Sequence, residues 1–129
     1  MFWGHAEACG FIDDIATDLE RACFYIINPE YGASRADFFR LTLLKYLGGV
    51  WMDHKCTISL PGGLEELCNG IPGSPPELIL CTWGGNAKRH DGRLDPSTLL
   101  QRGEISNGFM YAIARRPIIT MTLNDVLSN

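Results

Sequence analysis

Asp37, Arg40 and Asp53 are the residues of this chain whose types and spacing point most directly to chemistry. Asp37 and Arg40 lie three positions apart, which places both side chains on one face of a helix. An arginine and two carboxylates that lie close together can hold a metal ion, a diphosphate or the hydroxyls of a sugar. The alternative is structural: Asp37 caps a helix, Arg40 pairs with Asp37 or a carbonyl, and Asp53 ends a strand. The residues alone leave both interpretations open.

The helix that would carry Asp37 and Arg40 is predicted over residues 35–47. Ser34 is the expected N-cap, and the glycine pair at 48–49 is the expected stop. Apolar residues cover most of the circumference of this helix, which predicts burial on more than one side. A buried Arg40 needs a charged partner, and Asp37 is the nearest one.

The remaining elements alternate between helices and strands. An apolar spacing of three and four predicts one helix over 11–27, with an inward face made of Ile12, Ile15, Leu19, Ala22, Cys23 and Ile26. Further elements are expected as strands at 50–53 and 78–83, a short helix at 64–69, a loop at 84–104, a third apolar segment at 105–114 that Asn107-Gly108 interrupts, and a last helix from Pro117 with Ile119, Leu123 and Val126-Leu127 inward. This order predicts an α/β fold with a small mixed sheet flanked by helices. Ligands of such sheets bind beyond the carboxyl ends of the strands, where Asp53 falls.

Composition excludes several classes of function. The chain has 129 residues, which predicts one domain, and its net charge of −4 provides no basic surplus for nucleic acid. No apolar run is long enough to cross a membrane, and the first residues do not resemble a secretory signal. The five cysteines include no C-x-x-C pair and the three histidines are scattered, so we expect buried free thiols and no zinc site, with one disulfide left open.

The stretch ASRADFFRLTLLKYLGGVWMD, from Ala33 to Asp53, resembles the sugar-binding region of DXD-type glycosyltransferases. That group includes outer-chain mannosyltransferases and capsular polysaccharide synthesis proteins. The shared features, in order, are an Asp, an Arg three residues later, an apolar stretch, Tyr-x-Gly-Gly, an aromatic residue and an Asp. The resemblance is strongest over residues 33–60. Residues 103–110 resemble the Asn-bearing segment of the group, and 117–127 resemble the helix that follows it.

The resemblance implies a GT-A-like fold and a retaining transfer of a sugar from a nucleotide-diphosphate donor to a glycan or another hydroxyl acceptor. It implies that Asp37 and Arg40 hold the hydroxyls and phosphate of the donor, and that Asn107 lies near the donor sugar. It also implies that Asp53 contacts the ribose or a divalent cation, Mn²⁺ or Mg²⁺, that acts on the leaving diphosphate as a Lewis acid.

The motif departs from the group at its third position, because the chain reads Asp53-His54-Lys55 where the group has Asp-x-Asp. Side chains at i and i+2 of a strand point the same way, so an ammonium at Lys55 would repel the cation. Lys55 then either neutralises the diphosphate as a fixed charge, or the site has lost its metal and its activity. His54 is expected on the opposite face.

Length is the second departure from the group. The strands that bind the nucleobase usually precede the segment matched by Ala33, but residues before it read as helix and loop. We therefore expect a partial domain over 1–129, which is a fragment or a reduced relative, and a partner chain could supply the missing strands. The alternative function is a non-catalytic remnant or a module that binds sugar nucleotides. Trp83 and His90 are the acceptor-site candidates. The compartment is cytoplasmic or, for a fragment, the Golgi lumen.

Overall fold

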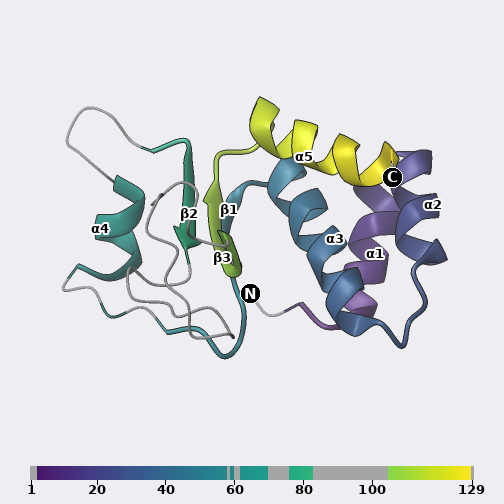
Figure 1. The fold of residues 1–129 in the computed structure, drawn as a ribbon, viewed down its shortest axis with the longest axis horizontal. Helices are drawn as coiled ribbons and strands as arrows, with labels where there is room; N and C mark the ends of the chain where they lie inside the picture. The colour runs from purple at the N-terminus through teal and green to yellow at the C-terminus, as the bar shows by residue number, and fades with distance from the viewer. Residues whose placement is uncertain (1–2, 58, 60–61, 70–75, 83–104, 129) are drawn as a thin grey trace, which may run out of the picture. The chain divides into compact units, whose positions relative to one another are not determined.

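A computed structural model describes residues 3–57, 59, 62–69, 76–82 and 105–128 of the chain, which form a mixed α/β structure. Figure 1 shows the elements along the chain. They are α1 (His5–Ile15), α2 (Asp18–Ile26), α3 (Gly32–Tyr46), β1 (Gly49–Met52), α4 (Gly63–Asn69), β2 (Leu78–Thr82), β3 (Ile105–Ala112) and α5 (Pro117–Ser128). None of the described helices has the length and apolarity required to cross a bilayer.

The chain divides into two compact units. The helical unit consists of Met1–Gly49 and Ala112–Asn129, and the strand unit consists of Val50–Tyr111. In the helical unit, α3 packs against α1, α2 and α5, and α5 also reaches α2 (Figure 1). These helices therefore bury their apolar faces on one another and build a core of their own.

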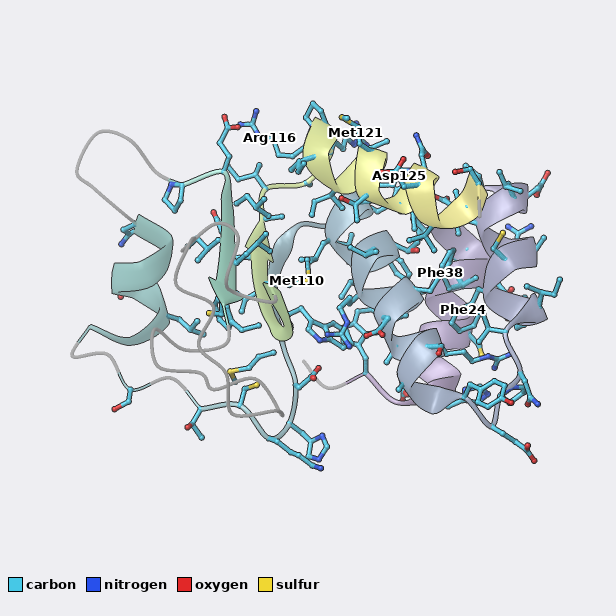
Figure 2. All side chains as sticks on the ribbon, in the orientation of Figure 1. Phe24, Phe38, Met110, Arg116, Met121 and Asp125 are labelled. Carbon is cyan, nitrogen blue, oxygen red and sulfur yellow. The ribbon has the colours of Figure 1, made fainter. Side chains whose placement is uncertain are left out.

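Aromatic rings from several helices fill the core of the helical unit. Phe24 of α2 and Phe38 of α3 lie near each other between their helices, with ring centroids 6.4 Å apart (Figure 2). Phe11 and Phe39 meet edge to face at 5.8 Å, and Trp3 packs on both rings. Edge-to-face contacts of this kind stabilise a core beyond the area that they bury.

The predicted helix over 11–27 is wrong, because the chain breaks into α1 and α2 at Ala16-Thr17. The Thr17 hydroxyl accepts the Glu20 N–H, and the Glu20 carboxylate accepts the Thr17 N–H at 2.8 Å, which is a complete capping box. The break changes which face of α2 points inward. Glu20 and Phe24 are buried, whereas Leu19 and Ile26 of the predicted apolar face are exposed.

Helix α3 begins earlier than predicted. Its first residue is Gly32 and its N-cap is Tyr31, so Ser34 lies inside the helix and is not the cap. In the first turn of α3, Arg35 is buried, its Nε donates to the Ile27 carbonyl at 2.9 Å, and its guanidinium lies over the Phe24 ring. This contact closes the end of α2 against the start of α3.

The predicted end of α3 is confirmed. Gly48 follows the helix with a φ of 65°, in the left-handed region that glycine adopts most easily. A Cβ atom at this position would lie 2.5 Å from the backbone nitrogen of Ala114. The position therefore requires glycine for two separate reasons.

The sheet consists of three strands in the order β1-β3-β2 and is antiparallel, so the predicted mixed sheet is wrong. Strand pairing over long stretches of sequence decides strand direction, and the local pattern carries little information about it. Asn107-Gly108 does not interrupt the third segment, because both residues lie within β3. In α5, Ile119 and Leu123 are buried as predicted, but Val126 is exposed.

Candidate functional site

Arg40 and Asp37 form an ion pair on one face of α3. Arg40 Nη2 lies 2.7 Å from Asp37 Oδ1, and Arg40 Nε donates to the Ala36 carbonyl at 3.3 Å. Arg40 is 5% exposed, whereas the Asp37 side chain is 50% exposed. The prediction that Asp37 would be the partner of a buried Arg40 is confirmed. The buried guanidinium thus holds a carboxylate that solvent, and a ligand hydroxyl, can reach.

Asp53 follows the last residue of β1 and is held in place by backbone and side-chain hydrogen bonds. Its N–H donates to the Gly108 carbonyl of β3, and its own carbonyl accepts the Cys56 N–H, both at 2.8 Å. The indole Nε1 of Trp51 donates to Asp53 Oδ1, also at 2.8 Å. Trp51 is half-buried, and the hydrogen bond from its indole orients the Asp53 carboxylate.

The geometry expected for Lys55 is wrong. The hydrogen bond from Cys56 to Asp53 closes a turn over these four residues, so Asp53 and Lys55 do not lie on one extended strand. The rule that side chains at i and i+2 point the same way therefore does not apply here. His54 and Lys55 are both exposed on this turn. Both side chains reach solvent directly.

The other predicted site residues are placed only in part. Asn107 lies in β3, beside the Gly108 whose carbonyl accepts the Asp53 N–H. Trp83 and His90, the acceptor-site candidates, lie outside the described residues. Asp37 and Arg40 belong to the helical unit, and Asp53, Lys55 and Asn107 belong to the strand unit.

Within the described residues, no three side chains of His, Cys, Asp or Glu come close enough together to hold a metal ion. Asp53 contributes one carboxylate, and one of its oxygens already accepts the Trp51 indole N–H. Mn²⁺ and Mg²⁺ need several oxygen ligands. Among the described residues, Asp53 alone therefore does not provide the ligand set of the cation that the resemblance implies.

A buried carboxylate that the sequence interpretation missed lies in the helical unit. Glu20 is 1% exposed, and its oxygens accept from Lys45 Nζ at 2.6 Å and from the Tyr46 hydroxyl at 2.8 Å. Thr17 also donates to it, through both N–H and hydroxyl. The signal that could have found Glu20 is the Thr17-x-x-Glu20 spacing, which is typical of a capping box.

The charges of this cluster depend on one another. Burial by itself raises the pKa of the Glu20 carboxyl, but hydrogen bonds from Lys45, Thr17 and Tyr46 outweigh it, so the pKa lies below its ordinary value of 4.5. Burial lowers the pKa of Lys45, and Glu20 more than reverses this, so the pKa of Lys45 lies above 10.5. Both groups are therefore charged over the whole neutral range.

We expect acid to destabilise the helical unit through Glu20. Because the pKa of Glu20 is lowered in the folded state, its contribution is fully present above 4.5 and is lost as the pH falls through the folded pKa. The contribution of Lys45 is present below 10.5 and is lost as the pH rises through its raised folded pKa. Urea denaturation followed by helical circular dichroism across this range measures both limbs. Glu20→Gln should reduce the loss of unfolding free energy at acid pH, whereas Glu7→Gln, at an exposed residue, should not. An equal loss at acid pH in the original protein and both variants would contradict the assignment.

Comparison of the chain with protein-family models, with curated proteins and with solved structures gives no match.

Proposed function

We propose that this chain is a retaining glycosyltransferase domain with a GT-A-like fold, which uses a nucleotide-diphosphate sugar as donor. The observation that carries the proposal is the pair on α3, in which a buried Arg40 lies 2.7 Å from a half-exposed Asp37. A carboxylate fixed in this way accepts hydrogen bonds from sugar hydroxyls in a set direction. The spacing along the sequence from this pair to Tyr46, to the glycine pair at 48–49 and to Asp53 matches the resembling group and supports the same assignment.

The geometry refines the roles that the resemblance gives to Asp37 and Arg40. Arg40 is 5% exposed and is bonded to Asp37 and to the Ala36 carbonyl. It therefore acts as a positioning residue that holds the Asp37 carboxylate. Asp37 is the group that meets the hydroxyls of the donor sugar.

The resemblance assigns further residues, all of which belong to the strand unit, to the nucleotide and the donor sugar. Asp53, oriented by the Trp51 indole, accepts from the ribose hydroxyls. The ammonium of Lys55 neutralises negative charge on the leaving diphosphate, which lowers the energy of the transition state. Asn107 lies in β3, and the resemblance assigns it to the donor sugar.

In the proposed reaction, the bond between the anomeric carbon and the diphosphate oxygen breaks, and a bond from the same carbon to the acceptor oxygen forms on the same face. The electron pair of the broken bond leaves with the diphosphate. The diphosphate oxygen takes the proton of the acceptor hydroxyl, so the reaction needs no base from the protein.

Calorimetric titration with a panel of nucleotide-diphosphate sugars, followed by an assay of donor hydrolysis and transfer, tests the proposal. We expect binding and turnover of at least one donor, with Asp37→Asn and Asp53→Asn each weakening binding about tenfold, the size of one good polar contact. Asp18→Asn, which changes a fully exposed carboxylate on α2, is the matched control and should bind as the original protein does. If Asp37→Asn and Asp53→Asn both bind the donor with unchanged affinity, the site assignment is wrong.

The second candidate function is a non-catalytic module that binds sugar nucleotides. Lys55 favours it, because a lysine stands where the resembling group has its second metal-binding aspartate. The same titration separates the candidates: donor binding without turnover, with and without Mn²⁺, would replace the transferase by the module. No binding of any donor would exclude both.

A further inference from the structure

His5 and Cys9 lie on one face of α1, outside every residue used in the proposed function. They are separated by one helical turn, and the side chains of a helix lean towards its N-terminus, so Cys9 points back over His5. The Cys9 Sγ lies 3.7 Å from the His5 Nε2. His5 is exposed and Cys9 is half-buried. The expectation of buried thiols is therefore wrong for Cys9. The i, i+4 spacing of His5 and Cys9 within a helix is the sequence signal for this pair.

The distance between these two atoms is the one that a shared metal ion requires. Zinc binds cysteine sulfur at about 2.3 Å and histidine nitrogen at about 2.0–2.1 Å, and a tetrahedral angle between them separates the two ligand atoms by about 3.6 Å. The observed 3.7 Å is close to this value. His5 is exposed, so a metal ion can reach this pair of atoms from solvent.

Two side chains of α2 hold Asp13, which lies one helical turn after Cys9 on α1. The Tyr25 hydroxyl of α2 donates to Asp13 Oδ1 at 2.9 Å. This contact ties α1, the helix that carries His5 and Cys9, to α2. Arg21 lies 3.9 Å from Asp13 and balances the carboxylate charge.

We propose that His5 Nε2 and Cys9 Sγ together bind one thiophilic divalent cation of the zinc class, with water in the remaining coordination positions. Cys9 releases its proton to solvent on binding, and the thiolate and the neutral imidazole each give an electron pair to the metal. The site has two protein ligands, so the bound ion exchanges readily and stays open to further ligands. This inference does not depend on the transferase proposal, because it uses none of the same residues.

Protection of the thiols by Zn²⁺ tests this site. The full chain is first reduced with a reductant that contains no thiol. It is then treated with iodoacetamide with and without Zn²⁺, and the alkylation rate of each cysteine is measured by peptide mass spectrometry. We expect Zn²⁺ to slow alkylation of Cys9 about tenfold or more and to leave Cys23 unchanged. Cys23 is the matched control, because it is also a half-buried free thiol in the helical unit.

His5→Gln separates a metal site from a simple thiol–imidazole hydrogen bond. The exposed His5 can be replaced without disturbing the core, and we expect Cys9 to be alkylated in this variant with its protection by Zn²⁺ lost. His54→Gln, which changes another exposed histidine, should retain the protection. Equal slowing of Cys9 and Cys23, protection that survives His5→Gln, or no slowing at all would each overturn the proposal.

Discussion

Glu20→Ala is expected to lower the free energy of unfolding of the helical unit by about 3 kcal/mol, within the range for removing one member of a buried ion pair. The Glu20 carboxylate is 1% exposed and accepts hydrogen bonds from Lys45, Tyr46 and Thr17. Its removal leaves a partly buried ammonium and a phenol without their acceptor. The effect should lie at the lower end of the range, because 20% of the Lys45 side chain remains exposed to water.

The position of Glu20 makes the cost larger than that of a surface ion pair. The same carboxylate completes the capping box of α2, so Glu20→Ala also leaves the Thr17 N–H without an acceptor. Asp18→Ala is the matched control: Asp18 lies two residues earlier, is fully exposed and pairs with Arg21, so its loss should change stability little. Urea denaturation followed by helical circular dichroism measures both variants.

A double-mutant cycle of Glu20→Gln and Lys45→Met isolates the ion pair from the cap. We expect a coupling energy of about 1–3 kcal/mol, as for residues in one hydrogen-bonded network. If Glu20→Ala costs no more than Asp18→Ala, or if the cycle shows no coupling, α2 and α3 are not joined by this cluster.

Glu20 also shows why sequence patterns predicted α3 well and α2 poorly. The inward face of α3 follows from its own residues, and the pairing of Arg40 with Asp37 occurs within a single turn. The spacing of Ile12, Ile15 and Leu19 continues across Thr17, so the apolar pattern alone predicts one unbroken helix. The partner of Glu20 is Lys45, 25 residues away, and a local pattern carries no information about contacts at that distance.

The same division applies to the candidate site. The ion pair of Arg40 with Asp37 on α3 could be predicted, because it depends on local spacing. The direction of Lys55 could not, since it depends on the turn that the Cys56 N–H closes onto Asp53. The antiparallel sheet likewise comes from strand pairing between distant segments. The rule that ligands bind beyond the carboxyl ends of strands applies to parallel sheets, so it does not support a ligand at Asp53 in this antiparallel sheet. The support for Asp53 as a candidate is instead the hydrogen bond from Trp51, which orients its carboxylate.

Gly48→Ala is expected to destabilise the helical unit by about 3 kcal/mol or more, because it combines left-handed backbone strain with a steric clash. The φ of Gly48 is 65°, and a Cβ atom there would lie 2.5 Å from Ala114 N and 2.8 Å from Ala112 O. Both are backbone atoms, so no side chain can turn aside to relieve the contact. Ala112 is fully buried, which leaves the segment little room to move.

Two other glycines separate the clash from the strain. Gly49 also has a positive φ, of 94°, but an added Cβ meets nothing within 4 Å, so Gly49→Ala should cost only the strain, about 1–2 kcal/mol. Gly10 lies within α1 and is equally open, so Gly10→Ala should stabilise the chain by about 0.5–1 kcal/mol. We therefore expect the denaturation midpoint to be highest for Gly10→Ala, lower for Gly49→Ala and lowest for Gly48→Ala. If Gly48→Ala and Gly49→Ala are equally stable, the close approach to Ala114 does not limit this position and only the turn requires glycine.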